Sequence, residues 1–269
     1  MSDLVYDRVQ QSLLELKLSR MAEVLDPVSE EAARSEQTYL EFLDQLLTEE
    51  QTARYQRRVA MKTKLARFPY VKTLEQFDFS FQPSIDERRI RELATLRFVA
   101  NGENLILLGP PGVGKTHLAV ALGVLAVAQG HNPYFITVPE LLELLEKDAK
   151  EGRLQQRMRA LCKPGLLILD EMGYLPINQM AAHFLFQLVA RRYEKGSILI
   201  TSNKSYGQWG EIFFSDNILA AALLDRLLHH STTINIRGQS YRLREKRKAG
   251  IFQEPGELLT ESDSDTERR

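Results

Sequence analysis

Apolar residues gather into short runs in the part of the chain after residue 100, and polar, glycine or proline residues bound each run. Runs of this length are typical of buried strands. The predicted strands are Asn104–Gly109, Pro133–Val138, Leu166–Asp170, Ser197–Ser202 and Thr232–Arg237. Because helical patterns separate them, the sequence predicts an α/β fold whose parallel five-stranded sheet has helices on both faces.

The first part of the chain carries a different pattern. From Leu4 to about Leu65, apolar residues recur at helical spacing and no strand signal interrupts them. Pro27 is predicted to break this helical run. The sequence therefore predicts a small all-α region over 1–66, and the basic run described below makes a partner or DNA its candidate contact.

The remainder is expected to form one α/β domain over 67–250, with Phe68–Pro69 and Phe77–Pro83 as a linker wrapping onto it. The last segment, 251–269, is acidic and nearly free of large apolar residues, so we expect it to be disordered. The single cysteine, Cys162, excludes an internal disulfide and favours a reducing compartment. Neither a signal peptide nor a run long enough to span a bilayer is present, so a cytoplasmic protein without membrane contact is predicted.

The net charge of −1 hides strong local segregation of charge. Between Gln51 and Leu74 the sequence has seven basic residues and no acidic one. Such a run is either a solvated helix face or a nucleic-acid contact, and nearby aromatic residues keep the second reading open. The basic residues of this run that are candidates for DNA binding are Arg54, Arg57, Arg58, Lys62 and Lys64.

The segment Gly109–Thr116 matches every fixed position of the phosphate-binding loop pattern G-x-x-x-x-G-K-[ST], between a predicted strand and the apolar helix Leu118–Ala128. Glycines let backbone N–H groups turn toward phosphate oxygens, and the helix N-terminus adds partial positive charge. Lys115 would reach the terminal phosphates, and the Thr116 hydroxyl would bind Mg²⁺. The residues predicted to hold ATP here are Gly109, Pro110, Pro111, Gly112, Val113, Gly114, Lys115, Thr116 and His117.

Two carboxylates follow the third predicted strand. Asp170 is expected to hold Mg²⁺ together with Thr116, and Glu171 to polarise a water for attack on the terminal phosphate. The fourth strand ends in Ser202-Asn203. If that strand lies between the loop strand and the acidic strand, Asn203 would orient the attacking water.

A helix is predicted over Leu223–His230, with Arg226 at its exposed edge. Arg226 is a candidate arginine finger for the ATP of the next subunit, and the alternative is a surface arginine paired with Asp225. The pair His229-His230 has no second ligand pair at metal spacing, so the sequence predicts no zinc site there.

These motifs, in this order, resemble the AAA+ ATPases of the IstB type, which are transposition helpers of insertion sequences and close relatives of the DnaC-type replicative helicase loaders. The resemblance rests on GPPGVGKTHLA, LILDEMGYLP, the TSN turn and ALLDRLLHHS, and it covers roughly Leu13 to Lys248. The phosphate loop alone is unspecific among P-loop proteins. DEMGYLP and LLDRLLHHS are much more particular.

The resemblance implies a three-layer P-loop AAA+ domain. It makes Gly109–Thr116 the Walker A motif, Asp170 and Glu171 Walker B, Asn203 sensor 1 and Arg226 the arginine finger. Arg242 would sense nucleotide in its own subunit. It further implies a helical insert that touches DNA phosphates, with the basic residues Lys147, Lys150, Arg153 and Arg157.

The function implied is an ATP-hydrolysing helper that assembles on double-stranded DNA as a homo-oligomer, with ATP at subunit interfaces, and that recruits its cognate IstA-type transposase. A replicative helicase loader is the alternative with the same ATPase core. A kinase of small molecules is disfavoured by the Asp-Glu pair, the arginine-finger candidate and the basic runs. A DNA-binding module with a vestigial ATPase is disfavoured because every residue needed for hydrolysis is present.

Overall fold

The computed structural model describes residues 2–174, 177–213 and 217–248, and the acidic segment expected to be disordered, 251–269, lies outside them. The chain divides into two compact units, Met1–Lys64 and Leu65–Arg269, which are described one at a time.

The first unit is helical, as the apolar spacing predicts. Its helices are α1 (Ser2–Glu15), α2 (Ser19–Arg34) and α3 (Tyr39–Leu65, which ends at the boundary between the units). A small core forms where Val24, Leu25 and Val28 of α2 pack near Leu46 of α3. The predicted break at Pro27 is wrong, because Pro27 lies inside α2. An internal proline costs a helix about 3 kcal/mol, and burial of the apolar residues on both sides of it offsets that cost.

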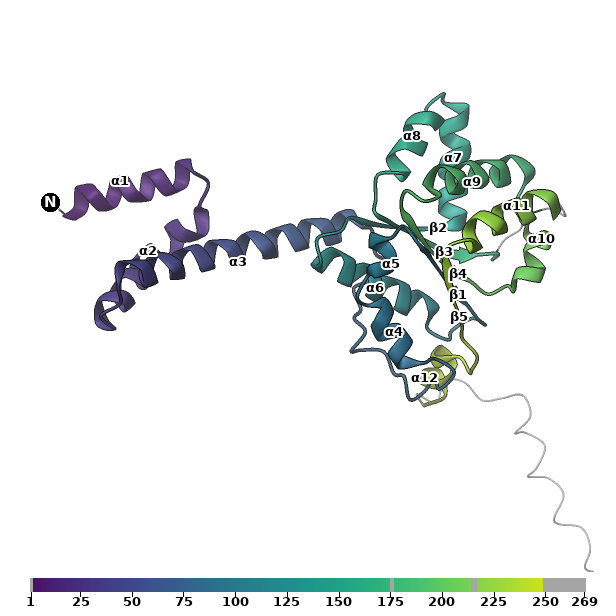
Figure 1. The fold of residues 1–269 in the computed structure, drawn as a ribbon, viewed down its shortest axis with the longest axis horizontal. Coiled ribbons are helices and arrows are strands. Elements are labelled where there is room, and N and C mark those ends of the chain that lie inside the picture. The colour runs from purple at the N-terminus through teal and green to yellow at the C-terminus, as the bar shows by residue number, and fades with distance from the viewer. Residues whose placement is uncertain (1, 175–176, 214–216, 249–269) are drawn as a thin grey trace, which may run out of the picture. The chain divides into compact units, whose positions relative to one another are not determined.

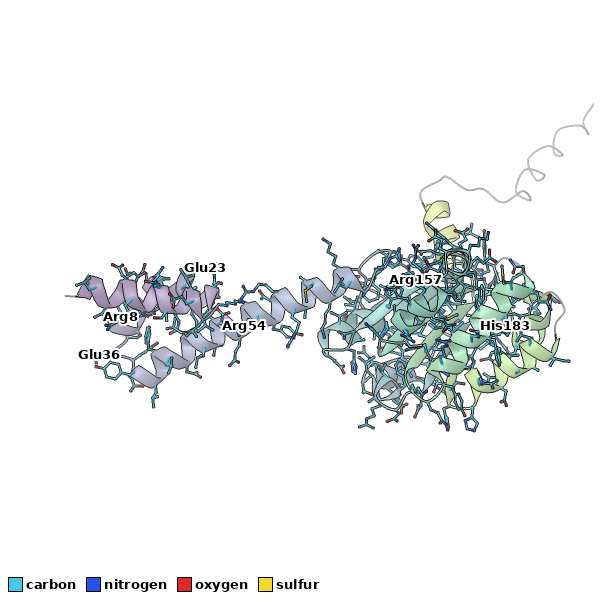
Figure 2. The ribbon with its side chains drawn as sticks, turned by 90° about the horizontal axis from the view of Figure 1, so that it is seen from above. Arg8, Glu23, Glu36, Arg54, Arg157 and His183 are labelled. Carbon is cyan, nitrogen blue, oxygen red and sulfur yellow. The ribbon has the colours of Figure 1, made fainter. Side chains whose placement is uncertain are left out.

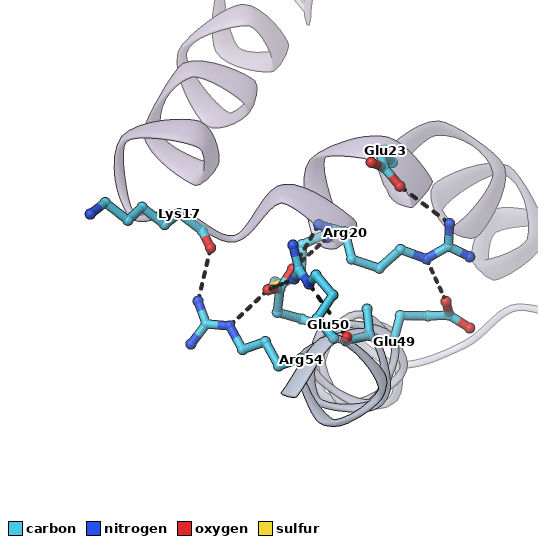
Figure 3. Close-up of polar contacts among 9 residues, drawn as sticks. Lys17, Arg20, Glu23, Glu49, Glu50 and Arg54 are labelled. Atoms are coloured by element: carbon cyan, nitrogen blue, oxygen red, sulfur yellow. Dashed lines mark hydrogen bonds and ion pairs between the residues drawn. The ribbon is translucent and has the colours of Figure 1, made fainter. Parts of the chain in front are cut away.

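A buried carboxylate ties α2 to α3 (Figure 3). Glu50 on α3 is only 3% exposed, and its side chain accepts hydrogen bonds from the backbone N–H groups of Arg20 (2.7 Å) and Met21 (3.1 Å) at the start of α2. Arg54 and Arg57 pair with the same carboxylate at 2.8 and 3.2 Å. Burial alone would raise the pKa of Glu50, but these hydrogen bonds lower it overall.

The second unit is built on a parallel five-stranded sheet with strand order β2-β3-β4-β1-β5. All five predicted strands are present. Their bounds are β1 (Asn104–Leu108), β2 (Pro133–Thr137), β3 (Leu166–Met172), β4 (Ser197–Ser202) and β5 (Ser231–Asn235). Since β4 lies between β1 and β3, the ends of the phosphate-loop strand and the acidic strand are separated by one strand.

Helices cover both faces of this sheet (Figure 1), so the unit has three layers. One face is covered by α4 (Glu87–Leu93), α5 (Arg97–Ala100) and α6 (Lys115–Ala128). The other face is covered by α7 (Val138–Lys150), α8 (Leu154–Leu161), α9 (Gln179–Arg192), α10 (Trp209–Ile212) and α11 (Asn217–Leu228). Side chains of β1 alternate between the two faces: Leu105 and Leu107 pack in the core with α4–α6, and Ile106 and Leu108 pack in the core with α7–α11.

Two short elements complete the described part of the chain: a 3₁₀ turn, Tyr206–Gln208, and helix α12 (Tyr241–Lys248) near the sheet's carboxyl end. Among the described helices, none combines the length and apolarity that crossing a bilayer requires.

Candidate nucleotide site

The phosphate loop joins β1 to α6. Gly112 and Gly114 have φ angles of +82° and +97°, a region that L-residues with side chains rarely adopt. A Cβ at Gly114 would lie 2.6 Å from the Phe77 ring. The loop therefore needs glycine at both positions, and it places the N-terminus of α6 at the carboxyl end of the sheet, where anions are favoured.

Lys115 is the first residue of α6, and its ammonium donates hydrogen bonds to the carbonyl oxygens of Gly109 (2.7 Å) and Pro110 (2.8 Å). Burial lowers the pKa of Lys115, and the nearby negative charge of Asp170 opposes that shift. Within the described residues, the acceptors that contact this half-buried cation are neutral carbonyl oxygens. An anionic phosphate would restore the favourable electrostatics that burial removes, so the side chain fits a phosphate-binding role.

Thr116 and Asp170 meet beside the loop. The Thr116 hydroxyl lies 3.0 Å from both carboxylate oxygens of Asp170, which is 3% exposed. The Thr201 hydroxyl of β4 donates to the same carboxylate at 2.5 Å. A carboxylate and a hydroxyl are oxygen ligands of the kind that Mg²⁺ prefers, so the donor set fits this ion.

Glu171 follows Asp170 in a left-handed conformation with φ of +64°, which is rare for a residue other than glycine. The pairing register of β3 with β4 shifts between Leu169 and Met172, so the strand is irregular at this point. The Glu171 N–H donates to the Thr201 hydroxyl at 3.0 Å. As a result Asp170 is buried and Glu171 is exposed, although the two are adjacent in the chain. Strained residues of this kind concentrate at functional sites.

A cavity of about 200 Å³ opens beside the phosphate loop. One wall consists of residues 112–117, and a second consists of Tyr241 and Arg242 of α12. The third wall comes from the segment 70–82, with Tyr70, Phe77 and Phe81 among its lining residues. Aromatic side chains beside a phosphate cradle suit the base and sugar of a nucleotide. The sequence predicts part of this segment to be a linker, and its place in the site carries no sequence signal because the segment has no strand or helix periodicity.

Arg242 lies in the same cavity as the phosphate loop of its own chain, and hydrogen bonding from the Tyr241 N–H to the Gly112 carbonyl (3.0 Å) anchors α12 there. His117 also lines the cavity. One ring nitrogen, Nε2, lies 2.9 Å from the Thr73 carbonyl oxygen, and burial lowers the pKa of this imidazole. His117 thus links α6 to the 70–82 segment.

Asn203 is exposed directly after β4, which does lie between β1 and β3. Arg226 lies elsewhere, half-buried on α11. Its guanidinium donates to the Ala222 carbonyl at 3.1 Å and lies 4.6 Å from the centre of the Phe186 ring. Its described contacts are therefore with the backbone of its own helix and with α9, and they do not include the phosphate loop of its own chain.

The basic candidates of α3 have different surroundings. Arg54, labelled in Figure 2, and Arg57 neutralise the buried Glu50. The Arg58 guanidinium lies 5.7 Å from the centre of the Tyr55 ring. Lys62 is half-buried and Lys64 is exposed near the end of the helix. Two of the five candidates thus have a clear structural task.

In the predicted helical insert, the candidate arginines are paired with acids and the candidate lysines are exposed. Arg157, labelled in Figure 2, donates to Asp148 at 2.6 Å, and Arg153 pairs with that carboxylate at 3.6 Å and with Glu151. The hydrogen bond from Arg157 is the main cause of the lowered pKa of Asp148. Lys147 and Lys150, in the last turn of α7, are exposed.

A family model described as IstB-like ATP binding protein matches residues 11–249. The chain belongs to this family. The resemblance drawn from the motifs is thereby confirmed. Among IstB-like relatives, the ATP-binding protein of insertion sequence IS21 from Pseudomonas aeruginosa is 54% identical over 240 residues, which cover 89% of this chain and 90% of that protein. That of IS5376 from Geobacillus stearothermophilus is 49% identical over 241 residues, covering 90% and 96%.

Solved structures bear on the fold of this IstB-like chain. The crystal structure of DnaI aligns with a TM-score of 0.52 at 23% identity, over 64% of this chain and 93% of that one. DnaA from Aquifex aeolicus, solved with AMPPCP bound, aligns with a TM-score of 0.52 at 19% identity, over 70% and 59%. These likenesses confirm the predicted P-loop AAA+ architecture.

Proposed function

We propose that this chain is an ATPase that acts as a transposition helper: it assembles on duplex DNA, selects or remodels the target and recruits its cognate IstA-type transposase. The observation that carries the proposal is the contact network of Thr116, Asp170, Thr201 and Glu171 beside the phosphate loop. Its insertion-sequence relatives favour a role in transposition over the loading of a replicative helicase.

In this proposal each side chain has a separate task. Lys115 and the N-terminus of α6 bind the ATP phosphates, and the cavity lined by Tyr70 and Arg242 holds the remainder of the nucleotide. Thr116 and Asp170 would hold Mg²⁺, which supplies positive charge that offsets the charge on the phosphates. Glu171 accepts a proton from the attacking water, and Asn203 orients that water.

Arg226 would complete the site of a neighbouring subunit, since its described contacts do not include its own phosphate loop. A homo-oligomer with ATP at its interfaces follows from that role. The exposed lysines Lys147 and Lys150 would contact DNA phosphates, and Lys62 and Lys64 form a second candidate contact.

The test measures phosphate release by the full chain with Mg²⁺-ATP, with and without duplex DNA. It also measures capture of two purified partners: the transposase of the same insertion sequence and a replicative helicase. We expect hydrolysis, DNA binding and capture of the transposase only. If the protein binds DNA but does not hydrolyse ATP, it is a DNA-binding module without ATPase activity. If it captures the helicase and not the transposase, it is a helicase loader.

A further inference from the structure

Three side chains with metal-binding chemistry meet at the end of the sheet opposite the nucleotide site. Glu194 lies between α9 and β4, and His229 and His230 lie between α11 and β5. One ligand atom from each of the three lies within 4.8 Å of the others. The sequence predicts no zinc site at the histidine pair, because no second ligand pair stands at metal spacing; in the fold, the third group comes from a different loop.

One pair of ligand atoms already has nearly the spacing of a metal site. His230 Nε2 lies 3.5 Å from Glu194 Oε1. Zinc bonds of about 2.0–2.1 Å at tetrahedral angles place two ligand atoms about 3.3 Å apart, so this pair needs little movement. All three residues are exposed, which leaves a fourth position open to water.

Neighbouring residues hold the ligands in place. The Tyr193 hydroxyl lies 2.7 Å from Nδ1 of His229 and also hydrogen bonds with Glu194, so it contacts two of the three side chains. A second group that binds the other ring nitrogen is typical of metal-binding histidines. The His230 carbonyl accepts a hydrogen bond from the Asn104 N–H at 2.8 Å, and Glu194 has a left-handed φ of +56°. Backbone hydrogen bonds from the Lys195 and Gly196 N–H groups to the Arg192 carbonyl (2.9 and 3.1 Å) tie the Glu194 loop as well.

We propose that Glu194, His229 and His230 form a binding site for a divalent transition metal ion, Zn²⁺ in particular. Two imidazoles and one carboxylate suit zinc, whereas Mg²⁺ prefers an octahedral shell of oxygen ligands. The bound ion would link the α9–β4 loop to the α11–β5 loop and stabilise the folded chain increasingly as the free zinc concentration rises above the dissociation constant. This site is independent of the proposed ATPase.

The test titrates the full chain with Zn²⁺ against a chromophoric zinc indicator, in the absence of nucleotide. We expect one saturable equivalent, at least tenfold weaker in His229→Ala and in His230→Ala. Tyr193→Phe should weaken binding by about 10–100-fold, since it removes the group that orients His229. Mg²⁺ should not compete.

The matched control is His183→Ala, which removes another exposed histidine, labelled in Figure 2, from α9. It should leave zinc affinity unchanged. Thermal unfolding in EDTA shows whether each variant folds, and a fixed concentration of added Zn²⁺ should raise the melting temperatures of the parent and of His183→Ala more than those of the other variants. Absence of a saturable equivalent, or zinc binding that survives His229→Ala combined with His230→Ala, would overturn the proposal.

Discussion

The Thr201 hydroxyl bridges the two acids of β3: it accepts a hydrogen bond from the Glu171 N–H at 3.0 Å and donates one to the Asp170 carboxylate at 2.5 Å. Thr201 itself is 1% exposed. A single hydroxyl on β4 therefore supports both the buried orientation of Asp170 and the left-handed backbone of Glu171.

Replacing Thr201 by Val keeps its shape and removes this bridge. We expect kcat for ATP to fall at least tenfold, which corresponds to about 1.4 kcal/mol in the activation barrier, with little change in nucleotide affinity. Thr201→Ser should restore most of the rate because it keeps the hydroxyl. Steady-state kinetics and nucleotide titration of both variants check this, and equal rates for Val and Ser would show that the bridge has no part in turnover.

Lys115 and Glu171 should separate binding from hydrolysis. Lys115→Met removes the half-buried cation that would face phosphate, and we expect roughly 10–100-fold weaker ATP binding. Glu171→Gln keeps the shape of the side chain and removes the proton acceptor, so binding should persist while turnover falls by about 10²–10⁴-fold. Fluorescent-nucleotide titration and phosphate release measure the two effects. A Glu171→Gln protein with the parental rate would contradict the assignment.

Arg226 should act on the site of a neighbouring subunit. Arg226→Ala and Lys115→Ala proteins are each expected to be inactive, yet a mixed interface can pair an intact phosphate loop with an intact arginine. Recovered ATPase activity in the mixture is the expected result. Because Arg226 also packs against Phe186, co-assembly on DNA is verified first by sedimentation. Co-assembly without recovery would mean that Arg226 is structural.

DNA binding should depend on the exposed lysines of α7. We expect neutralising Lys147 and Lys150 to reduce the slope of log affinity against log salt by roughly two units, about one for each lost phosphate contact. Arg88→Gln combined with Arg89→Gln removes two exposed charges from α4 and is the matched control. An unchanged slope in the lysine variant would place the DNA contact elsewhere.

Arg157→Gln tests a different role for a basic residue in the same insert. It removes the main partner of the buried Asp148, so we expect a lower melting temperature. Its effect on DNA binding should be measured below that temperature. A parental melting temperature would mean that this pair contributes little to folding.

Glu50 should make the first unit sensitive to acid. Its pKa is lowered in the folded chain, so its stabilising contribution is complete above its ordinary value of 4.5 and is lost as the pH falls through the lowered value. Hydrogen exchange of the Arg20 and Met21 amides should therefore be slow at neutral pH and accelerate, after correction for intrinsic rates, below about pH 4.5. Glu50→Gln should exchange faster at pH 7 and lose most of this pH dependence.

The positions of the inner strands could be predicted because each is an apolar run with a polar end, as in Leu166–Asp170, whereas β5 is mostly polar and is recognised from its place after the helical patterns. The contacts made by charged residues could not be predicted from the sequence. Glu50 and Asp148 look like surface acids in sequence, yet both are buried and hold arginines that the basic patches suggested for DNA. Charge runs show composition, and only the packing of one helix on another decides which charges remain exposed.

The same limit applies to the site. The phosphate loop can be found from its spacing, since one continuous segment contains it. The wall formed by Tyr70 and Phe77 cannot, because an irregular segment reaches the loop only through the tertiary fold. The approach of Glu194 to the histidine pair also cannot be predicted from the sequence, because the residues come from two separate loops that no local pattern joins.

The spatial order of the strands also sets an order in time. The ribosome completes the phosphate loop and Asp170 well before β4 and β5, which are the two neighbours of β1 in the sheet. Until residue 235 is made, β1 lacks at least one of its partners, and Asp170 lacks Thr201 until β4 exists. A nascent chain therefore carries the phosphate loop and Asp170 before the contacts around them have formed. Under the proposed function, ATP would stabilise the domain only late in synthesis.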